Sequence, residues 1–388
     1  MNRFEYCNPT RLVFGADEEN RIGELILPRL SEGKRVMVVY GGGSVKRSGL
    51  LDRVTASLAA SGIEAVEFGG ARVNPTLEHV RAGIELAREK NVGVMLAVGG
   101  GSVIDTAKGI ALGAPYEGDV WDFFARGVAP KTALPVACVL TLPAAGSEQS
   151  IRVVINGEGR KLGAGTPVVR PFASVINPKL FFTLPQKQIR AGVIDMMSHI
   201  MERYFTQTEA VDFISGQAEA ALVSIMKNGL IVRDDHENYD AWSQIGLAGS
   251  FAHNGYFGLG HDEDWACHGI EHELSAWDET ITHGEGLAVL TPAWMKHVWK
   301  ANPARFERFA VNVMGAKGDT QEERIENGIE ALKGFFKAMG APVTMRELGA
   351  ENAPFARMAE LVTAKTGSVG NFVKLTAADV EAIYLSAK

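Results

Sequence analysis

The hydrophobic positions in the first half of the chain form short continuous runs separated by amphipathic segments. Residues 35–40 and 92–98 are two such runs, each followed by Gly-Gly-Gly-Ser, and residues 135–141 and 172–176 are two more. Runs of this length, rich in β-branched residues, are typical of strands buried on both faces of a parallel sheet. The alternation of such strands with helical segments predicts a doubly wound, mostly parallel α/β domain.

Two of the helices between these strands have recognisable starting signals. Asn74 followed by Pro75 predicts a helix with Asn74 as its cap and Pro75 at its first position, running to about Lys90. Ser102 and Asp105 have the spacing of a capping box at the start of the helix after the second glycine run.

The pattern changes near Pro185, beyond which apolar residues recur with the helical period and strand-like runs are almost absent. The segment after Thr320 is the clearest, because Thr320 and Glu323 form a capping box and Gly340 ends the helix. Its predicted apolar face consists of Ile325, Ile329, Leu332, Phe336 and Met339. Helices are expected over residues 187–205, 209–230, 238–257, 264–276, 284–300, 303–314, 320–339, 353–365 and 377–387. We therefore expect an α/β domain over residues 1–185 and an all-helical domain over residues 186–388.

Length and composition support this division and exclude several classes of function. A chain of 388 residues exceeds what one hydrophobic core usually serves. The net charge of −7, with scattered basic residues, argues against a nucleic-acid partner. No apolar stretch approaches the roughly 18 residues of a membrane span, and the N-terminus lacks the apolar core of a secretory signal. Because three cysteines are too few for a disulfide framework, we expect a cytoplasmic protein and interpret Cys267 as a buried thiol.

Both copies of Gly-Gly-Gly-Ser-Val follow a predicted strand and open a predicted helix. Glycines there let backbone N–H groups approach phosphate oxygens, although each copy alone could equally be an ordinary tight turn. Neither copy spells the Gly-x-Gly-x-x-Gly fingerprint of Rossmann domains. Two copies at the carboxyl ends of parallel strands, where such sheets bind ligands, favour a nucleotide phosphate site.

Lys46 and Arg47 follow the first glycine run, in what we predict to be the first turn of a helix. Cations there oppose the helix dipole, and an anionic ligand would reverse that effect. If this loop holds the adenosine ribose, a 2′-phosphate fits and NADP is favoured over NAD. The alternative is that both side chains point into solvent.

Carboxylate and imidazole side chains recur at helical spacing in the second half. Asp195 and His199 lie one turn apart, as do His268 and His272, and His283 follows eleven residues later. Each pair alone is ambiguous, since Asp-x-x-x-His is usually a surface pair. Together, one carboxylate and three imidazoles would suit Zn²⁺ or Fe²⁺. The other histidines occur singly and are interpreted as surface or locally hydrogen-bonded: His79, His236, His253, His261 and His297.

These segments together resemble the iron-containing (group III) alcohol dehydrogenase family, and within it the branch of butanol dehydrogenases and NADPH-dependent aldehyde reductases. The resemblance spans essentially the whole chain, through residues 8–15, 40–44, 97–105, 141–148, 195–202 and 265–286. It implies a metal-dependent enzyme that transfers a hydride between NAD(P)H and a primary alcohol or aldehyde, and a homodimer. The implied metal is Fe²⁺ or Zn²⁺, and the implied cofactor is NADP, with NAD as an alternative.

The resemblance also implies roles for individual residues. The implied metal ligands are Asp195, His199, His268 and His283, whereas His272 lies beside the nicotinamide and is a candidate for relaying a proton. Gly99, Gly100, Ser102 and Asp105 match the pyrophosphate loop, and Gly41, Gly42 and Ser44 match the adenosine-side loop. Thr141, Leu142, Ser147 and Lys161 match further cofactor contacts. Two features depart from the family pattern: Ala145 stands where threonine is usual, and residues 260–264 are unusually acidic.

Three other functions are compatible with parts of this pattern. A polyol (glycerol-type) dehydrogenase would differ in its preferred substrate. A lyase similar to dehydroquinate synthase would also combine NAD with a divalent metal, but its ligand set has a glutamate where Asp195 stands. A non-catalytic nucleotide-binding module is disfavoured by the intact set of four candidate ligands.

Overall fold

The computed structural model describes residues 1–388, and the chain divides into two compact units. One unit comprises residues 7–183, and the other comprises residues 1–6 and 184–388. Residues 1–6, which we expected in the N-terminal domain, belong instead with the second unit. Their backbone explains this difference, because Asn2 N donates to Gly260 O at 2.6 Å and the Met1 amino group donates to Glu209 O at 3.0 Å.

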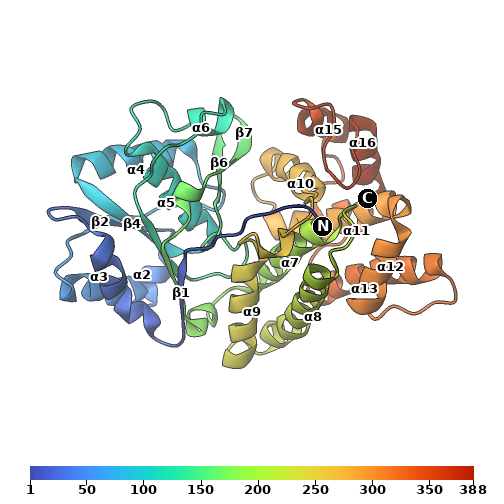
Figure 1. The fold of residues 1–388 in the computed structure, drawn as a ribbon, viewed down its shortest axis with the longest axis horizontal. Helices are drawn as coiled ribbons and strands as arrows, with labels where there is room; N and C mark the ends of the chain where they lie inside the picture. The colour runs from blue at the N-terminus through green and yellow to red at the C-terminus, as the bar shows by residue number, and fades with distance from the viewer. The chain divides into compact units, whose positions relative to one another are not determined.

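The unit of residues 7–183 is built on a six-stranded parallel sheet with the order β1-β8-β5-β4-β2-β3. Figure 1 labels β1, β2 and β4 of this sheet. Its strands are β1 (Arg11–Phe14), β2 (Arg35–Tyr40), β3 (Ala65–Phe68), β4 (Val92–Gly99), β5 (Val136–Leu140) and β8 (Ala173–Ile176). A separate antiparallel hairpin consists of β6 (Arg152–Gly157) and β7 (Arg160–Gly165). The parallel α/β architecture predicted from the hydrophobic runs is confirmed.

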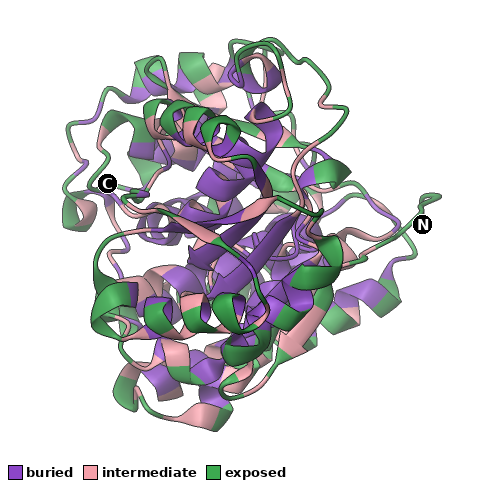
Figure 2. Cartoon of the chain, turned by 90° about the vertical axis from the view of Figure 1, so that its left-hand side faces the viewer, coloured by how far each residue is buried: buried purple, intermediate pink, exposed green.

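Helices cover both faces of this sheet, and Figure 2 shows its strands as a buried band between them. Val38 and Leu96 share one hydrophobic core with residues of α1 (Ile22–Ile26) and α3 (Leu50–Ala60). The alternate residues Met37 and Met95 are also fully buried, because side chains alternate between faces along a strand. The remaining helices of this unit are α2 (Ser44–Arg47), α4 (Leu77–Glu89), α5 (Gly101–Gly113) and α6 (Asp122–Ala125), of which α4 and α5 contact β4.

Two predicted helix starts in this unit are wrong. Asn74 adopts a left-handed backbone (φ 61°), and α4 begins at Leu77 with Thr76 as its cap, whose hydroxyl accepts the N–H of His79. The helix after the second glycine run begins at Gly101 and has no side-chain cap. Asp105 does not close a capping box, because its carboxylate is bonded to other segments.

The second unit is helical apart from one isolated backbone bridge (Figure 1). Its helices are α7 (Gln186–Tyr204), α8 (Asp212–Asp234), α9 (Tyr239–Ala252), α10 (Ala266–Trp277), α11 (His283–Val298), α12 (Pro303–Asn312), α13 (Gln321–Ala338), α14 (Met345–Leu348), α15 (Phe355–Thr363) and α16 (Ala377–Ser386). The capping box of Thr320 and Glu323 is confirmed, and the predicted apolar face of α13 is buried. No helix in the structure has the combination of length and hydropathy that a membrane crossing requires.

Candidate active site

The central helix of the second unit, α7, carries two of the predicted site residues. Asp195 and His199 lie one turn apart on it, so their side chains share one face. The two side chains converge, with His199 Nδ1 3.6 Å from Asp195 Oδ1. Both residues are buried, in contrast to the exposed position usual for such a pair.

The other two predicted ligands come from α10 and the first residue of α11. His268 Nε2 and His283 Nε2 each lie 3.8 Å from Asp195 Oδ1. The approach of α11 to α7 requires Gly284, because a Cβ there would stand 2.1 Å from the carbonyl oxygen of Ala191. The structure therefore brings the three predicted histidines around one carboxylate oxygen of Asp195.

The atoms at the centre of this group have no hydrogen-bond partner. Asp195 Oδ1, His199 Nδ1 and His268 Nε2 are all buried and unpaired, and suitable ligand atoms of these residues lie within 4.8 Å of one another. Leaving such groups unpaired costs about 1–3 kcal/mol each. A divalent cation would satisfy them together, and a donor set of one carboxylate with imidazoles fits Fe²⁺ or Zn²⁺.

The electrostatics of the group also favour positive charge at its centre. Although burial favours the neutral acid, the imidazoles of His199, His283 and His268 hold the pKa of Asp195 well below its ordinary value. Burial lowers the pKa of His199. Burial also opposes the charged form of His268, but the carboxylates of Asp195 and Glu202 outweigh it and raise the pKa of His268 to about 9.

Two buried glutamates that the sequence analysis did not assign lie behind the histidines. Glu202 Oε1 is 3.0 Å from His268 Nδ1 and also accepts the backbone N–H of His268 at 2.8 Å. Glu271 Oε2 forms a short hydrogen bond with His283 Nδ1. Their spacing in the sequence could have indicated that they lie near the site. Glu202 follows His199 by three residues on α7, and Glu271 stands between His268 and His272 on α10.

A second group with metal-ligand spacing shares His283 with the first. It consists of Glu271, His272 and His283, and the rings of His272 and His283 have centroids 5.3 Å apart. In the structure, Glu271 Oε2 is engaged by His283 Nδ1, whereas His283 Nε2 is the nitrogen near Asp195. The geometry therefore favours the group around Asp195 and leaves His272 at its edge.

Several neighbouring residues prove to have structural partners. Glu285 is engaged by Arg190 and Thr282 and does not join the histidines. In the acidic stretch, Glu263 pairs with Arg203 at 3.0 Å, and Asp264 accepts backbone N–H groups of residues 371 and 372. Cys267 is a buried thiol as predicted.

Two of the histidines predicted to lie outside the metal site, His261 and His253, have contacts near it. His261 is locally hydrogen-bonded as predicted, with Nε2 2.8 Å from Arg203 O. His253 is more closely connected to the group than the sequence indicated, because its ring centroid lies 4.3 Å from that of His199.

In the other unit, the second glycine run lies between the end of β4 and the start of α5. No side chain caps α5, so the N–H groups of Gly101 and Ser102 are available to an anion, whereas Val103 N already donates to Gly100 O at 3.0 Å. The segment after β5 lies against this loop. Thr141 N donates to Gly99 O at 3.1 Å, and a Cβ at Gly100 would stand 3.0 Å from the Leu142 side chain. This open, uncapped loop fits a pyrophosphate.

Asp105 and Ser147 lie behind the loop and bond to each other. Ser147 Oγ donates to Asp105 Oδ1 at 2.6 Å, and Val154 N donates to Asp105 Oδ2 at 2.9 Å. Lys108, which the sequence analysis did not single out, is fully buried and donates to the Ser147 hydroxyl at 2.9 Å. Asp105 therefore connects α5 to Ser147 and to β6. Lys161 lies on β7 of the adjoining hairpin.

The first glycine run connects β2 to α2 and lies next to the second, because β2 and β4 are neighbouring parallel strands. A Cβ at Gly42 would meet no atom within 4 Å, so its backbone is open to a ligand. Helix α2 is a single turn, so Lys46 and Arg47 lie in its first turn as predicted but also at its C-terminal end, where cations do not oppose the helix dipole. Lys46 does not point freely into solvent either, because it pairs with Glu67.

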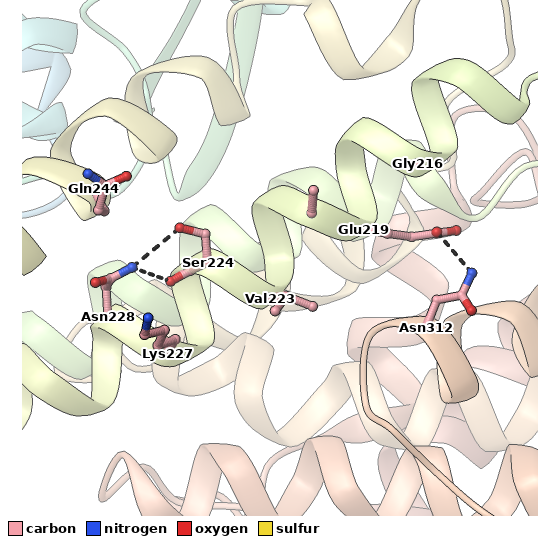
Figure 3. Close-up of a pocket in the computed structure, with 9 residues that line it drawn as sticks. Gly216, Glu219, Val223, Ser224, Lys227, Asn228, Gln244 and Asn312 are labelled. Carbon is pink, nitrogen blue, oxygen red and sulfur yellow. Dashed lines mark hydrogen bonds between the residues drawn. The ribbon is translucent and has the colours of Figure 1, made fainter.

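A hollow on the helical unit is separate from the histidine group. It has a volume of about 630 Å³ and is lined by residues of α8, α9 and α12 (Figure 3). Its buried polar groups already have partners: Glu219 accepts from Asn312, and the Asn228 amide donates to Ser224. None of the four candidate ligands lines it, so we assign it no role in the chemistry.

The comparisons with known proteins agree with this geometry. Residues 9–178 match the family described as "Iron-containing alcohol dehydrogenase", and residues 189–388 match "Fe-containing alcohol dehydrogenase family, C-terminal". The chain is 40% identical to the "Probable NADH-dependent butanol dehydrogenase 1" of Bacillus subtilis over 99% of both chains. It is 34% identical to the "NADPH-dependent aldehyde reductase YqhD" of Escherichia coli over 91% of both.

A solved structure extends the similarity to three dimensions. The crystal structure of NADH-dependent butanol dehydrogenase A from Thermotoga maritima matches with a TM-score of 0.95 and 39% identity, covering 100% of this chain and 99% of that one. These matches cover nearly the whole chain and agree with its parallel sheet and its helical unit. The chain belongs to the iron-containing alcohol dehydrogenase family.

Proposed function

We propose that this protein is an NAD(P)H-dependent, divalent-metal-dependent alcohol dehydrogenase or aldehyde reductase that interconverts a primary alcohol and its aldehyde. Butanol and butyraldehyde represent the substrate class, which agrees with the names of the relatives. The observation that carries the proposal is the set of buried, unpaired ligand atoms of Asp195, His199 and His268, with His283 Nε2 beside them.

The proposed metal ligands are Asp195, His199, His268 and His283. A metal held there would act as a Lewis acid on the substrate oxygen, and a bound nicotinamide would supply or accept the hydride. The protein orients the ligands. Glu202 and Glu271 each engage the Nδ1 of a candidate ligand, which fixes the ring and directs its Nε2 toward Asp195. His272, at the edge of the group, would hold the proton exchanged with the substrate oxygen.

The proposed cofactor site uses the two glycine loops. Gly99, Gly100 and Ser102 would receive the pyrophosphate, with Asp105 and Ser147 supporting the loop, and Thr141, Leu142 and Lys161 would add further contacts. Gly41, Gly42 and Ser44 would receive the adenosine ribose. We propose NADP as the cofactor, with NAD also accepted, because no acidic residue stands within residues 41–44 to repel a 2′-phosphate. We also propose a homodimer, which light scattering on the purified protein would test.

Metal analysis combined with an activity assay tests the proposal. Protein purified without added metal should contain about one Fe²⁺ or Zn²⁺ per chain and should consume NADPH or NADH steadily with butyraldehyde. A lyase similar to dehydroquinate synthase would show no net consumption of reduced cofactor, since it uses the cofactor only transiently. A polyol dehydrogenase would prefer glycerol to butanol in the oxidative direction. Absence of both metal and cofactor turnover would refute the proposal.

A further inference from the structure

A network of three side chains lies beside the first glycine loop. Lys46 Nζ is 3.4 Å from Glu67 Oε2, and the Tyr40 hydroxyl donates to the same oxygen at 2.9 Å. Lys46 Nζ also stands 5.0 Å from the centroid of the Tyr40 ring, which is a cation–π contact. The three residues come from α2, β3 and β2, so the network joins three elements at the carboxyl edge of the sheet.

This network adjoins the loop that the proposed function assigns to the adenosine ribose. Tyr40 directly precedes Gly41, and the segment after β3 is bonded to the same place, with Gly70 N donating to Gly41 O at 3.0 Å. Arg47 turns toward the loop as well, because a Cβ at Gly43 would stand 2.6 Å from its Nη1. Two cations and one carboxylate therefore lie beside the loop that the proposed function assigns to the adenosine ribose.

The two cations are not equivalent. No carboxylate pairs with Arg47 in the structure, whereas Lys46 is engaged by Glu67. A 2′-phosphate approaching the loop would meet the free guanidinium but would have to compete with Glu67 for the ammonium. It would also meet the negative charge of Glu67 itself, whose side chain is 47% exposed.

We propose that Glu67 limits the preference of this enzyme for NADP over NAD by holding Lys46 away from the 2′-phosphate of NADP. The proposal rests on the proposed function for the identity of the ligand. It assigns Glu67, Lys46 and Tyr40 a role in specificity.

The test measures dissociation constants of NADPH and NADH by nicotinamide fluorescence, which does not require turnover. Glu67→Gln should tighten NADPH binding roughly two- to fivefold, the range expected for an exposed charge, and should change NADH binding by less than about 1.5-fold. Lys46→Ala should weaken NADPH binding, because it leaves Glu67 unopposed. The double variant Glu67→Gln/Lys46→Ala should not show the tighter NADPH binding expected of Glu67→Gln alone. Raising the ionic strength should reduce the effect of Glu67→Gln.

Glu64→Gln provides the matched control. Glu64 directly precedes β3, at the opposite end of the strand, and pairs with Arg35 at 2.7 Å, so the variant makes the same change of net charge away from the loop. An unchanged ratio of NADPH to NADH affinity in Glu67→Gln, or an equal shift in Glu64→Gln, would overturn the proposal. If the wild-type protein bound neither dinucleotide, the proposed function itself would be wrong.

Discussion

At the scale of single residues, two candidate ligands divide their ring nitrogens between the centre of the site and a buried acid. His268 presents Nε2 to Asp195 and Nδ1 to Glu202, and His283 presents Nε2 to Asp195 and Nδ1 to Glu271. A hydrogen on Nδ1 leaves the lone pair of Nε2 free to bind a cation. The glutamates therefore determine which tautomer each ligand adopts.

Replacing one of these acids should weaken metal binding without removing a ligand. Glu202→Gln keeps the size of the side chain but loses its charge, so we expect metal affinity to fall about tenfold, at the lower end of the usual 10–100-fold effect. Competition with a fluorescent chelator measures this. Glu263→Gln is the control, because Glu263 pairs with Arg203 and is not bonded to a candidate ligand. Equal metal affinity in the wild type and Glu202→Gln would show that Glu202 only supports the fold.

The two histidines of α10 should behave differently from each other. His268→Ala removes an unpaired nitrogen that lies 3.8 Å from Asp195 Oδ1, so metal and activity should be lost together. His272→Ala should retain its metal and turn over slowly, because His272 lies at the edge of the group. Metal content and kcat measured on the same preparations distinguish the two. Loss of metal from His272→Ala would instead favour ligation by Glu271, His272 and His283.

At the scale of elements, continuous apolar runs and helical periodicity were sufficient to predict β2, β4 and the long helices of the second unit. Other elements had weaker local signals. Strands β1 and β3 are four residues long and only half-buried, and the β6–β7 hairpin lies outside the main sheet. The predicted start of α4 is wrong because Asn and Thr are both common N-cap residues, so the sequence around Asn74 and Thr76 does not decide between them. The choice between them depends on the left-handed turn at Asn74.

The candidate site could also be predicted only in part from the sequence. Helical spacing alone could pair Asp195 with His199 and His268 with His272, but it could not say which imidazole faces the carboxylate, since that depends on how α10 and α11 pack. The family resemblance supplied the set of four. Glu202, Glu271 and Lys108 were missed because their roles arise from contacts between segments distant in the chain.

Lys108 joins α5 to the chain segment of residues 147–152. Its ammonium donates to the carbonyl oxygens of Ser147, Ser150 and Arg152 as well as to the Ser147 hydroxyl. Lys108→Met would leave these buried acceptors unpaired, so we expect the free energy of unfolding to fall by about 3–5 kcal/mol. Urea denaturation measures the change.

Lys131→Met is the control for this prediction, because Lys131 is exposed and forms no ion pair. Its stability should match that of the wild type within about 0.5 kcal/mol. If Lys108→Met were equally stable, the buried ammonium would contribute nothing beyond what an apolar side chain of similar length provides.

At the scale of the whole molecule, the residues proposed to bind the metal and those proposed to bind the nucleotide belong to different units. All four candidate metal ligands belong to the helical unit, and both glycine loops belong to the α/β unit. A ligand stabilises the part of the protein that binds it, by about 4 kcal/mol when its concentration is 1,000 times its Kd. The two ligands should therefore leave separate signatures in amide hydrogen exchange.

Removing metal with a chelator should accelerate exchange in α7, in α10 and in the first turn of α11, and leave β2 and β4 unchanged. Adding NADPH to the metal-free protein should slow exchange in residues 41–47 and 99–105 instead. The metal-loaded protein without nucleotide is the reference for both measurements. If chelation instead accelerated exchange in the glycine loops and left α7 and α10 unaffected, the cation would be held by the nucleotide-binding unit. The assignment of Asp195 and its three histidines would then be wrong even if the enzyme remained metal-dependent.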